Sequence, residues 1–126
     1  MGTTSRAELR IPCDLRMLRL ARVTAASMAA DLPFTVQDIE DLRVAVDELA
    51  AAIIDSCDHG SHLLLTFESD DETVTVRGRV EGAGEAPELH PVAADLLSML
   101  ADHHELTTEG DDRVFMFTKQ PSALAP

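Results

Sequence analysis

Three carboxylates recur every seven residues along one segment that is rich in helix-forming residues. They are Asp41, Glu48 and Asp55, and residues seven apart lie on the same face of an α-helix. A carboxylate held in this way can act as a general base toward an attacking hydroxyl, and a second one can bind a metal ion. Acidic residues on a helix face are more commonly only solvated, so the spacing allows a catalytic or a purely structural interpretation.

Two further motifs have residue types that could bind a ligand. Gly82 and Gly84 form a Gly-x-Gly after an apolar run, which can either cradle a phosphate or only shape a loop. Cys57, His59 and His62 have the side chains of a transition-metal site, if a fourth ligand comes from elsewhere. The alternative for this cluster is a polar loop beside a buried thiol, and we therefore predict no metal ligand.

The length of the chain limits it to one compact domain. With 126 residues, it can bury roughly two thirds of the surface that the unfolded chain exposes. Hydrophobic residues make up 45% of the sequence and include neither Trp nor Tyr, which predicts a core of mainly aliphatic side chains. We expect a single domain over residues 1–120 and a flexible tail over residues 121–126.

The charge of the chain excludes several classes of partner. Its 10 Lys and Arg against 23 Asp and Glu give a formal net charge of -13, which repels phosphate backbones and anionic lipid surfaces. No apolar run approaches the roughly 20 residues that span a bilayer. Two cysteines without a C-x-x-C motif, and no signal-peptide pattern, are typical of a reducing compartment. We therefore expect a cytoplasmic protein that binds neither nucleic acid nor membrane.

Hydrophobic periodicity predicts the elements that position these residues. Apolar and polar residues alternate in the expected strands, and apolar residues recur every three or four positions in the expected helices. Thr35 followed by Asp38 predicts a capping box at the start of the second helix, which ends near Cys57. The third helix begins at Pro91, and its last turn reaches residues 103–104. In chain order we expect a strand over residues 6–11, a helix over 14–32, the second helix, strands over 63–68 and 73–80, the third helix, and strands over 105–108 and 113–119.

This order of elements predicts an α+β fold. Hairpins on both sides of the third helix favour a mixed, mainly antiparallel sheet of about five strands. An amphipathic helix buries its apolar stripe against another element, so we expect the three helices to cover one face of that sheet. The predicted architecture is a two-layer sandwich.

The second helix carries the most specific motif of the chain. Residues 41–55 have the sequence DLRVAVDELAAAIID and are preceded by a Pro-Phe-Thr linker. This segment resembles the N-box helix of RsbW-type anti-sigma factors, which are serine protein kinases with the histidine-kinase-like ATPase fold. Element order and spacing agree over nearly the whole chain, and the agreement is closest with the actinobacterial branch that inhibits stress-response sigma factors. The resemblance implies that fold with a shortened lid.

The resemblance assigns roles to particular residues. The family's base, which activates the hydroxyl of an anti-anti-sigma partner, matches Glu48. Its nucleotide-binding glycines match Gly82 and Gly84. An arginine of the first helix that contacts protein partners matches Arg22, for which the alternative is ordinary solvation of a helix face.

Departures from the family pattern fall in the nucleotide pocket. The family's metal-holding asparagine is Ala52 here, and the aspartate that reads the adenine amino group is Val80. Only residues 85–90 stand where the family has a long lid. The family's second glycine box falls at about Pro91 and Ala93, and a proline has no N–H that could face a phosphate.

The resemblance therefore implies a regulatory protein that binds and sequesters a sigma factor, without ATP turnover and without a cofactor. It also implies a homodimer and an anti-anti-sigma partner that competes for the protein. The alternative is an active serine protein kinase that uses Mg-ATP, with Glu48 as the base and Asp55 in place of the missing metal ligand. A more distant alternative is a metal or small-molecule sensor that uses Cys57, His59 and His62.

Overall fold

The computed structural model describes residues 4–55, 57 and 60–122, and residues 1–3, 56, 58–59 and 123–126 lie outside this description. Within the described residues, five strands form one sheet in the order β1-β2-β3-β5-β4, and each pairing is antiparallel. The strands alternate between buried and more exposed residues, as expected for a sheet with one covered face. Their bounds are β1 (Ser5–Pro12), β2 (His62–Ser69), β3 (Val74–Val80), β4 (His103–Glu109) and β5 (Asp112–Lys119).

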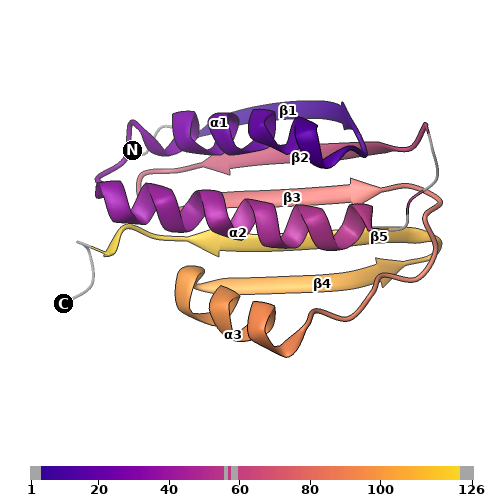
Figure 1. Cartoon of the computed structure of the whole chain (residues 1–126). Helices are drawn as coiled ribbons and strands as arrows, with labels where there is room; N and C mark the ends of the chain where they lie inside the picture. The colour runs from indigo at the N-terminus through magenta and orange to yellow at the C-terminus, as the bar shows by residue number, and fades with distance from the viewer. Residues whose placement is uncertain (1–3, 56, 58–59, 123–126) are drawn as a thin grey trace.

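The described helices cover one face of the sheet, as Figure 1 shows. They are α1 (Leu18–Ala29), α2 (Val36–Ile54) and α3 (Pro91–Leu100). The helix α1 lies over β2, α2 packs across β3 and β5, and α3 lies beside β4 (Figure 1). The predicted two-layer α+β class is confirmed. None of the described helices is long and apolar enough to cross a membrane.

The helix α2 begins with the predicted capping box. The Thr35 hydroxyl accepts a hydrogen bond from the Asp38 N–H, and the Asp38 carboxylate accepts one from the Thr35 N–H, both at 3.0 Å. The same carboxylate accepts from the Ser122 N–H at 3.1 Å. Burial raises the pKa of Asp38, but these hydrogen bonds from Thr35 and Ser122 outweigh it and hold the pKa below its ordinary value.

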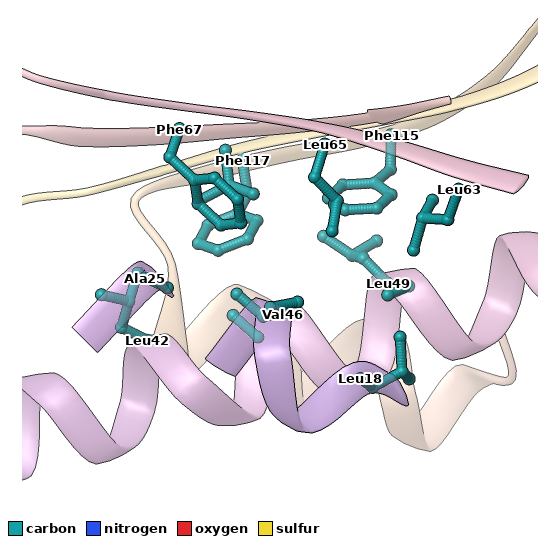
Figure 2. Close-up of a cluster of buried hydrophobic side chains, with 14 of the residues drawn as sticks. Leu18, Ala25, Leu42, Val46, Leu49, Leu63, Leu65, Phe67, Phe115 and Phe117 are labelled. Carbon is teal, nitrogen blue, oxygen red and sulfur yellow. The ribbon is translucent and has the colours of Figure 1, made fainter. Parts of the chain in front are cut away.

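The core lies between α2 and the sheet. Leu42, Val46, Leu49 and Ile53 recur at helical spacing and are fully buried. Figure 2 shows side chains of α2 pointing toward aromatic and leucine side chains that descend from the strands. The largest of these strand residues are Phe67, Phe115 and Phe117, and each is fully buried.

A glycine makes room for one of these rings. Gly78 on β3 lies opposite Phe115 on β5, and a Cβ atom at Gly78 would lie 2.2 Å from Cε2 of Phe115. That separation is far inside van der Waals contact. The ring of Phe115 therefore occupies the space that any larger residue at position 78 would need.

Two helix boundaries differ from their sequence predictions. Residues 14–32 do not form one helix, because the Asp14 carboxylate accepts from the Arg16 N–H at 2.9 Å and caps a separate 3-10 turn, Leu15–Met17, before α1. The third helix ends at Leu100, so its predicted last turn at residues 103–104 is wrong. These residues begin β4, since pairing with β5 satisfies their backbone in place of helical hydrogen bonds.

The sheet and the chain end also differ in detail from expectation. The sequence predicts a mixed, mainly antiparallel sheet, and each described strand pairing is antiparallel. The reason is that the connection from β1 to β2 contains two helices, and the second of them returns the chain in the opposite direction. Of the predicted tail, Pro121 is buried and Ser122 is bound to Asp38, and residues 123–126 lie outside the description.

Candidate functional site

A groove of about 550 Å³ lies between the second half of α2 and the segment that leads into α3. Glu48, Ala52 and Asp55 line it from α2 and its end, because positions four and three apart lie on one helix face. Residues 87–90 line it from the other side, and Cys13, directly after β1, contributes as well. This groove is the candidate functional site.

Two of the three carboxylates that were predicted to share a helix face lie in this groove. Glu48 and Asp55 line the groove together with Glu88 from the opposite segment, whereas Asp41 is not part of the described lining. Three negative charges in one concave site oppose the binding of phosphate groups unless a cation bridges them. Among the described residues, no three His, Cys, Asp or Glu side chains are placed to hold a metal ion. The charges therefore lie around the groove without forming a cation site.

Two further features leave the groove poor in groups that could bind phosphate. Ala52 presents only a methyl group at the position where the resembling family has its metal-binding asparagine. At the start of α3, Pro91 has no N–H, and the N–H of Val92 donates to Nδ1 of His90 at 3.2 Å. The start of α3 therefore offers a phosphate neither an N–H at position 91 nor a free N–H at Val92.

The two glycines of the Gly-x-Gly motif serve the fold. Both have the positive φ angles that favour glycine, 68° at Gly82 and 81° at Gly84. The Gly82 N–H donates to the Asp112 carboxylate at 2.9 Å, and the Gly84 N–H donates to the carbonyl of Asp111 at 2.8 Å. These bonds fasten the loop after β3 to the turn between β4 and β5. The described lining of the groove includes neither glycine.

Asp112 accepts two of the hydrogen bonds that hold this loop. It accepts from the Gly82 N–H and from Nη1 of Arg79, the latter at 2.6 Å. The Gly82 amide first, and the Arg79 guanidinium second, hold the pKa of Asp112 below its ordinary value. The amide that the motif would offer to a nucleotide is therefore already paired with a carboxylate that stays charged.

Arg22, the predicted partner-binding residue, joins two helices. Its Nη1 lies 2.8 Å from Oδ1 of Asp47 on α2, and the two side chains are 31% and 41% exposed. Part of each side chain thus reaches the surface. A partner carboxylate could reach the guanidinium only by sharing it with Asp47.

The outer side of α1 has exposed apolar residues, which the hydrophobic periodicity of the sequence did not predict. Leu15 and Val23 are 64% and 59% exposed, and Leu20 is partly exposed beside them. Residues 15–29 contain three arginines and no acidic residue, although the whole chain has a net charge of -13. The surface made by Leu15, Arg19, Leu20 and Val23 is called the α1 surface below. The local excess of arginine is the sequence signal that could have found it.

The structure also brings together two cysteines that the sequence left apart. Cys13, after β1, and Cys57, after α2, lie near enough to each other that Cys57 raises the pKa of Cys13. Nη1 of Arg113 on β5 lies 3.8 Å from Sγ of Cys57. Burial first, and then the charge and hydrogen bond of Cys57, raise the pKa of the Cys13 thiol to about 11, against a smaller opposing effect of Arg113.

Arg113 was missed by sequence reasoning, because an arginine in an alternating strand is ordinarily exposed. Its side chain is buried, and its Nη1 donates to the carbonyls of Ile53 and Asp55 at the end of α2. Its Nε has no hydrogen-bond partner among the described residues. Of the alternative metal cluster of Cys57, His59 and His62, His59 lies outside the described residues, so the structure does not test that alternative.

Comparison of the chain with models of known protein families gives no match, and comparison with curated proteins gives none either. The family resemblance therefore rests on the motif of α2 and on the order of the elements. It is carried forward as a proposal.

Proposed function

We propose that this chain is an anti-sigma factor-like regulatory protein that binds and sequesters a sigma factor without turning over ATP. The observation that carries the proposal is the α2 motif, which lines the groove. In this motif Ala52 stands where the resembling family has its metal-binding asparagine. Such a protein acts by binding, so it needs a stable scaffold and an exposed contact surface rather than a catalytic pocket.

The groove supports a protein without ATP turnover. Phosphoryl transfer depends on a metal ion that neutralises the phosphates and on donors that position them. Ala52 supplies no ligand atom, and the amides of Gly82 and Gly84 are bonded to Asp112 and Asp111. Each of these changes weakens nucleotide binding separately.

The α1 surface supports a role in protein binding. Exposed apolar residues next to arginines are enriched at the centres of protein interfaces. Val23 and Leu15 supply apolar area, and Arg19 supplies an exposed cation that donates to the carbonyl of Arg16. The remaining acidic surface suits a sigma factor, because surfaces that bind DNA are basic.

The proposed mechanism is the masking of sigma-factor surfaces that would otherwise bind RNA polymerase core or promoter DNA. Release would follow from competition by an anti-anti-sigma protein for the same surface, since no phosphorylation is available. We place the protein in the cytoplasm, where its partners act. A homodimer through β1 is part of the proposal, because β1 is an edge strand with an unpaired side among the described residues.

The test is direct binding to purified sigma factors of the cell that contains this protein. We expect one of them to bind at micromolar concentration or below in calorimetry, and to lose promoter-dependent transcription in the bound state. Failure of every sigma factor of that cell to bind would overturn the proposal. Light scattering of the free protein checks the dimer.

One observation favours the alternative of an active serine kinase. Glu48 and Asp55 line the same groove, as a base and a substitute metal ligand would have to do. The test is transfer of radiolabelled phosphate from Mg-ATP to a candidate anti-anti-sigma protein. Transfer that disappears in Glu48→Ala but persists in Asp41→Ala, a carboxylate of the same helix outside the groove, would establish the kinase. If no candidate partner is phosphorylated, the kinase alternative is excluded and the proposal of binding without ATP turnover stands.

A further inference from the structure

The groove beside α2 has carboxylates that no described residue neutralises. Glu48, Asp55 and Glu88 line it, and the described lining contains neither an arginine nor a lysine. Among the described residues, none of these three carboxylates has an ion-pair or hydrogen-bond partner, whereas Asp47 and Glu68 are each paired with an arginine. The groove therefore presents negative charge that a cationic partner can neutralise.

Much of the remaining lining is apolar. Ala51 and Ala52 line the groove from α2, Leu89 lines it from the segment before α3, and Leu15 comes from the turn before α1. A hydrated metal ion would leave this apolar area in contact with water. A ligand that buries the area must have apolar groups as well as cations, and an amphipathic basic segment of a protein has both.

The carboxylates on the α2 side have a spacing that a second helix can match. Glu48 and Asp55 are seven residues apart, which is about 10 Å along a helix axis, and both line the groove with Ala52 between them. A helix lying along α2 presents its own side chains at the same interval. Cations seven residues apart on that helix would therefore reach both carboxylates, and Glu88 on the opposite side is available to a third.

The groove also adjoins the α1 surface, because Leu15 belongs to both. Its side chain is 64% exposed, so it still has apolar area to bury. A partner that covers the α1 surface can therefore reach the groove without a gap between the two contacts.

We propose that the groove is the docking site for an amphipathic helix of a protein partner. Arginine or lysine side chains seven residues apart on that helix pair with Glu48 and Asp55, and its apolar side chains pack on Ala51, Ala52 and Leu89. The identification of this partner as the sigma factor rests on the proposed function.

The first experiment uses the full chain and a synthetic peptide, so it does not depend on any sigma factor. The peptide has about 15 residues, the length at which an isolated helix becomes stable. It carries leucines on one face, with arginines seven residues apart beside them, and a second peptide has the same composition in scrambled order. We expect calorimetry to show at least tenfold tighter binding of the ordered peptide, because only it presents the matching charge pattern.

Two double variants locate the binding on the protein. Glu48→Gln with Glu88→Gln removes two charges from the groove, whereas Asp41→Asn with Glu85→Gln removes two charges from the same helix and the same connecting segment outside the described lining. Both changes alter the formal net charge equally. We expect the groove variant to bind the ordered peptide at least tenfold more weakly and the matched control to bind it as the unaltered chain does.

A third variant tests the shape of the groove without changing its charge. Ala52→Leu places a larger side chain where the apolar side of the partner helix would pack, so it should also weaken peptide binding at least tenfold. Thermal melting of each variant shows whether the fold is retained. The comparison of the two peptides on the unaltered chain tests the proposal even if a variant folds poorly.

The second experiment repeats the titrations with any sigma factor that binds the unaltered chain. A loss of at least tenfold in the groove variant, with none in the matched control, is expected. Equal affinity for the two peptides, or equal losses in the two double variants, would overturn the docking site. If a sigma factor binds all variants alike, the docking site is wrong and the proposed function stands. If no sigma factor binds while the peptide results hold, the proposed function is wrong and the docking site stands.

Discussion

Arg113 on β5 donates from Nη1 to the carbonyl oxygen of Ile53, 3.1 Å away at the end of α2. The same nitrogen donates to the carbonyl of Asp55. The last carbonyls of a helix lack intrahelical partners and carry the negative end of the helix dipole, so a buried cation is favourable there. Arg113 thereby joins the sheet to the helix at one end of the groove.

Replacing Arg113 with methionine removes this connection. We expect Arg113→Met to lower the free energy of unfolding by roughly 2–4 kcal/mol, because the carbonyl of the buried Ile53 loses a charged donor. The matched control is Arg77→Met, since Arg77 forms an exposed ion pair with Glu68 on the open face of the sheet, and its loss should cost less than about 1 kcal/mol. Urea denaturation measures both, and equal losses would contradict the role assigned to Arg113.

Gly78 is expected to tolerate no side chain. Gly78→Ala should destabilise the protein by about 1–3 kcal/mol, because the new Cβ would overlap the ring of Phe115. Phe115→Leu in the same chain should recover part of that loss by vacating the space. Thermal melting of the two single variants and the double variant measures the coupling, and additive losses would show that the two residues do not share this space.

Stability should depend on the charge of Asp38. Its pKa is lowered in the folded state, so its contribution is fully present above the ordinary value of 3.8 and is lost as the pH falls through the folded value. At pH 7, Asp38→Asn should cost about 1 kcal/mol, as the loss of a capping interaction does. The deficit should shrink below about pH 4. Denaturation at several pH values checks this, with Asp95→Asn on the exposed side of α3 as a control for surface substitution; a deficit independent of pH would contradict it.

The α1 surface should contribute to sigma-factor binding. Val23→Glu is expected to weaken binding at least tenfold, or about 1.4 kcal/mol, because it places a charge in the apolar centre of the contact. Val92→Glu, on the similarly exposed Val92 of α3, should leave affinity unchanged. Calorimetric titration of both variants separates a contact at α1 from a general effect of added charge. Equal affinities for the two variants would place the interface elsewhere.

Restoring the family asparagine should not restore nucleotide binding. In Ala52→Asn the metal-ligand position regains an oxygen, yet Val80 still offers no partner for adenine and the amides of Gly82 and Gly84 stay engaged. A ligand that binds only the native state raises its stability. We therefore expect millimolar Mg-ATP to leave the melting temperature of the natural chain and of Ala52→Asn unchanged. A clear rise in either would favour the kinase alternative.

Much of the fold could be predicted from the sequence, because its signals are local. The apolar period of residues 42–53 and the pair Thr35 and Asp38 determine where α2 lies and how it starts, since helix turns and caps join residues three or four positions apart. Alternation in the strands determines which side chains enter the core. The end of the third helix was mispredicted because a distant strand, β5, supplied the competing hydrogen bonds.

Only the tertiary structure decided which residues line the groove and which distant residues are bonded to each other. The groove brings Cys13 and Glu88 beside α2, Arg113 is bonded to Ile53, and the Gly82 amide is bonded to Asp112, so each of these contacts joins residues that are far apart along the chain. Sequence spacing carries no information about such contacts, because they depend on how the helices lie across the sheet and on which loops meet at its ends. Periodicity is a property of a single element, whereas the groove exists only where α2, the end of β1 and the segment before α3 lie together.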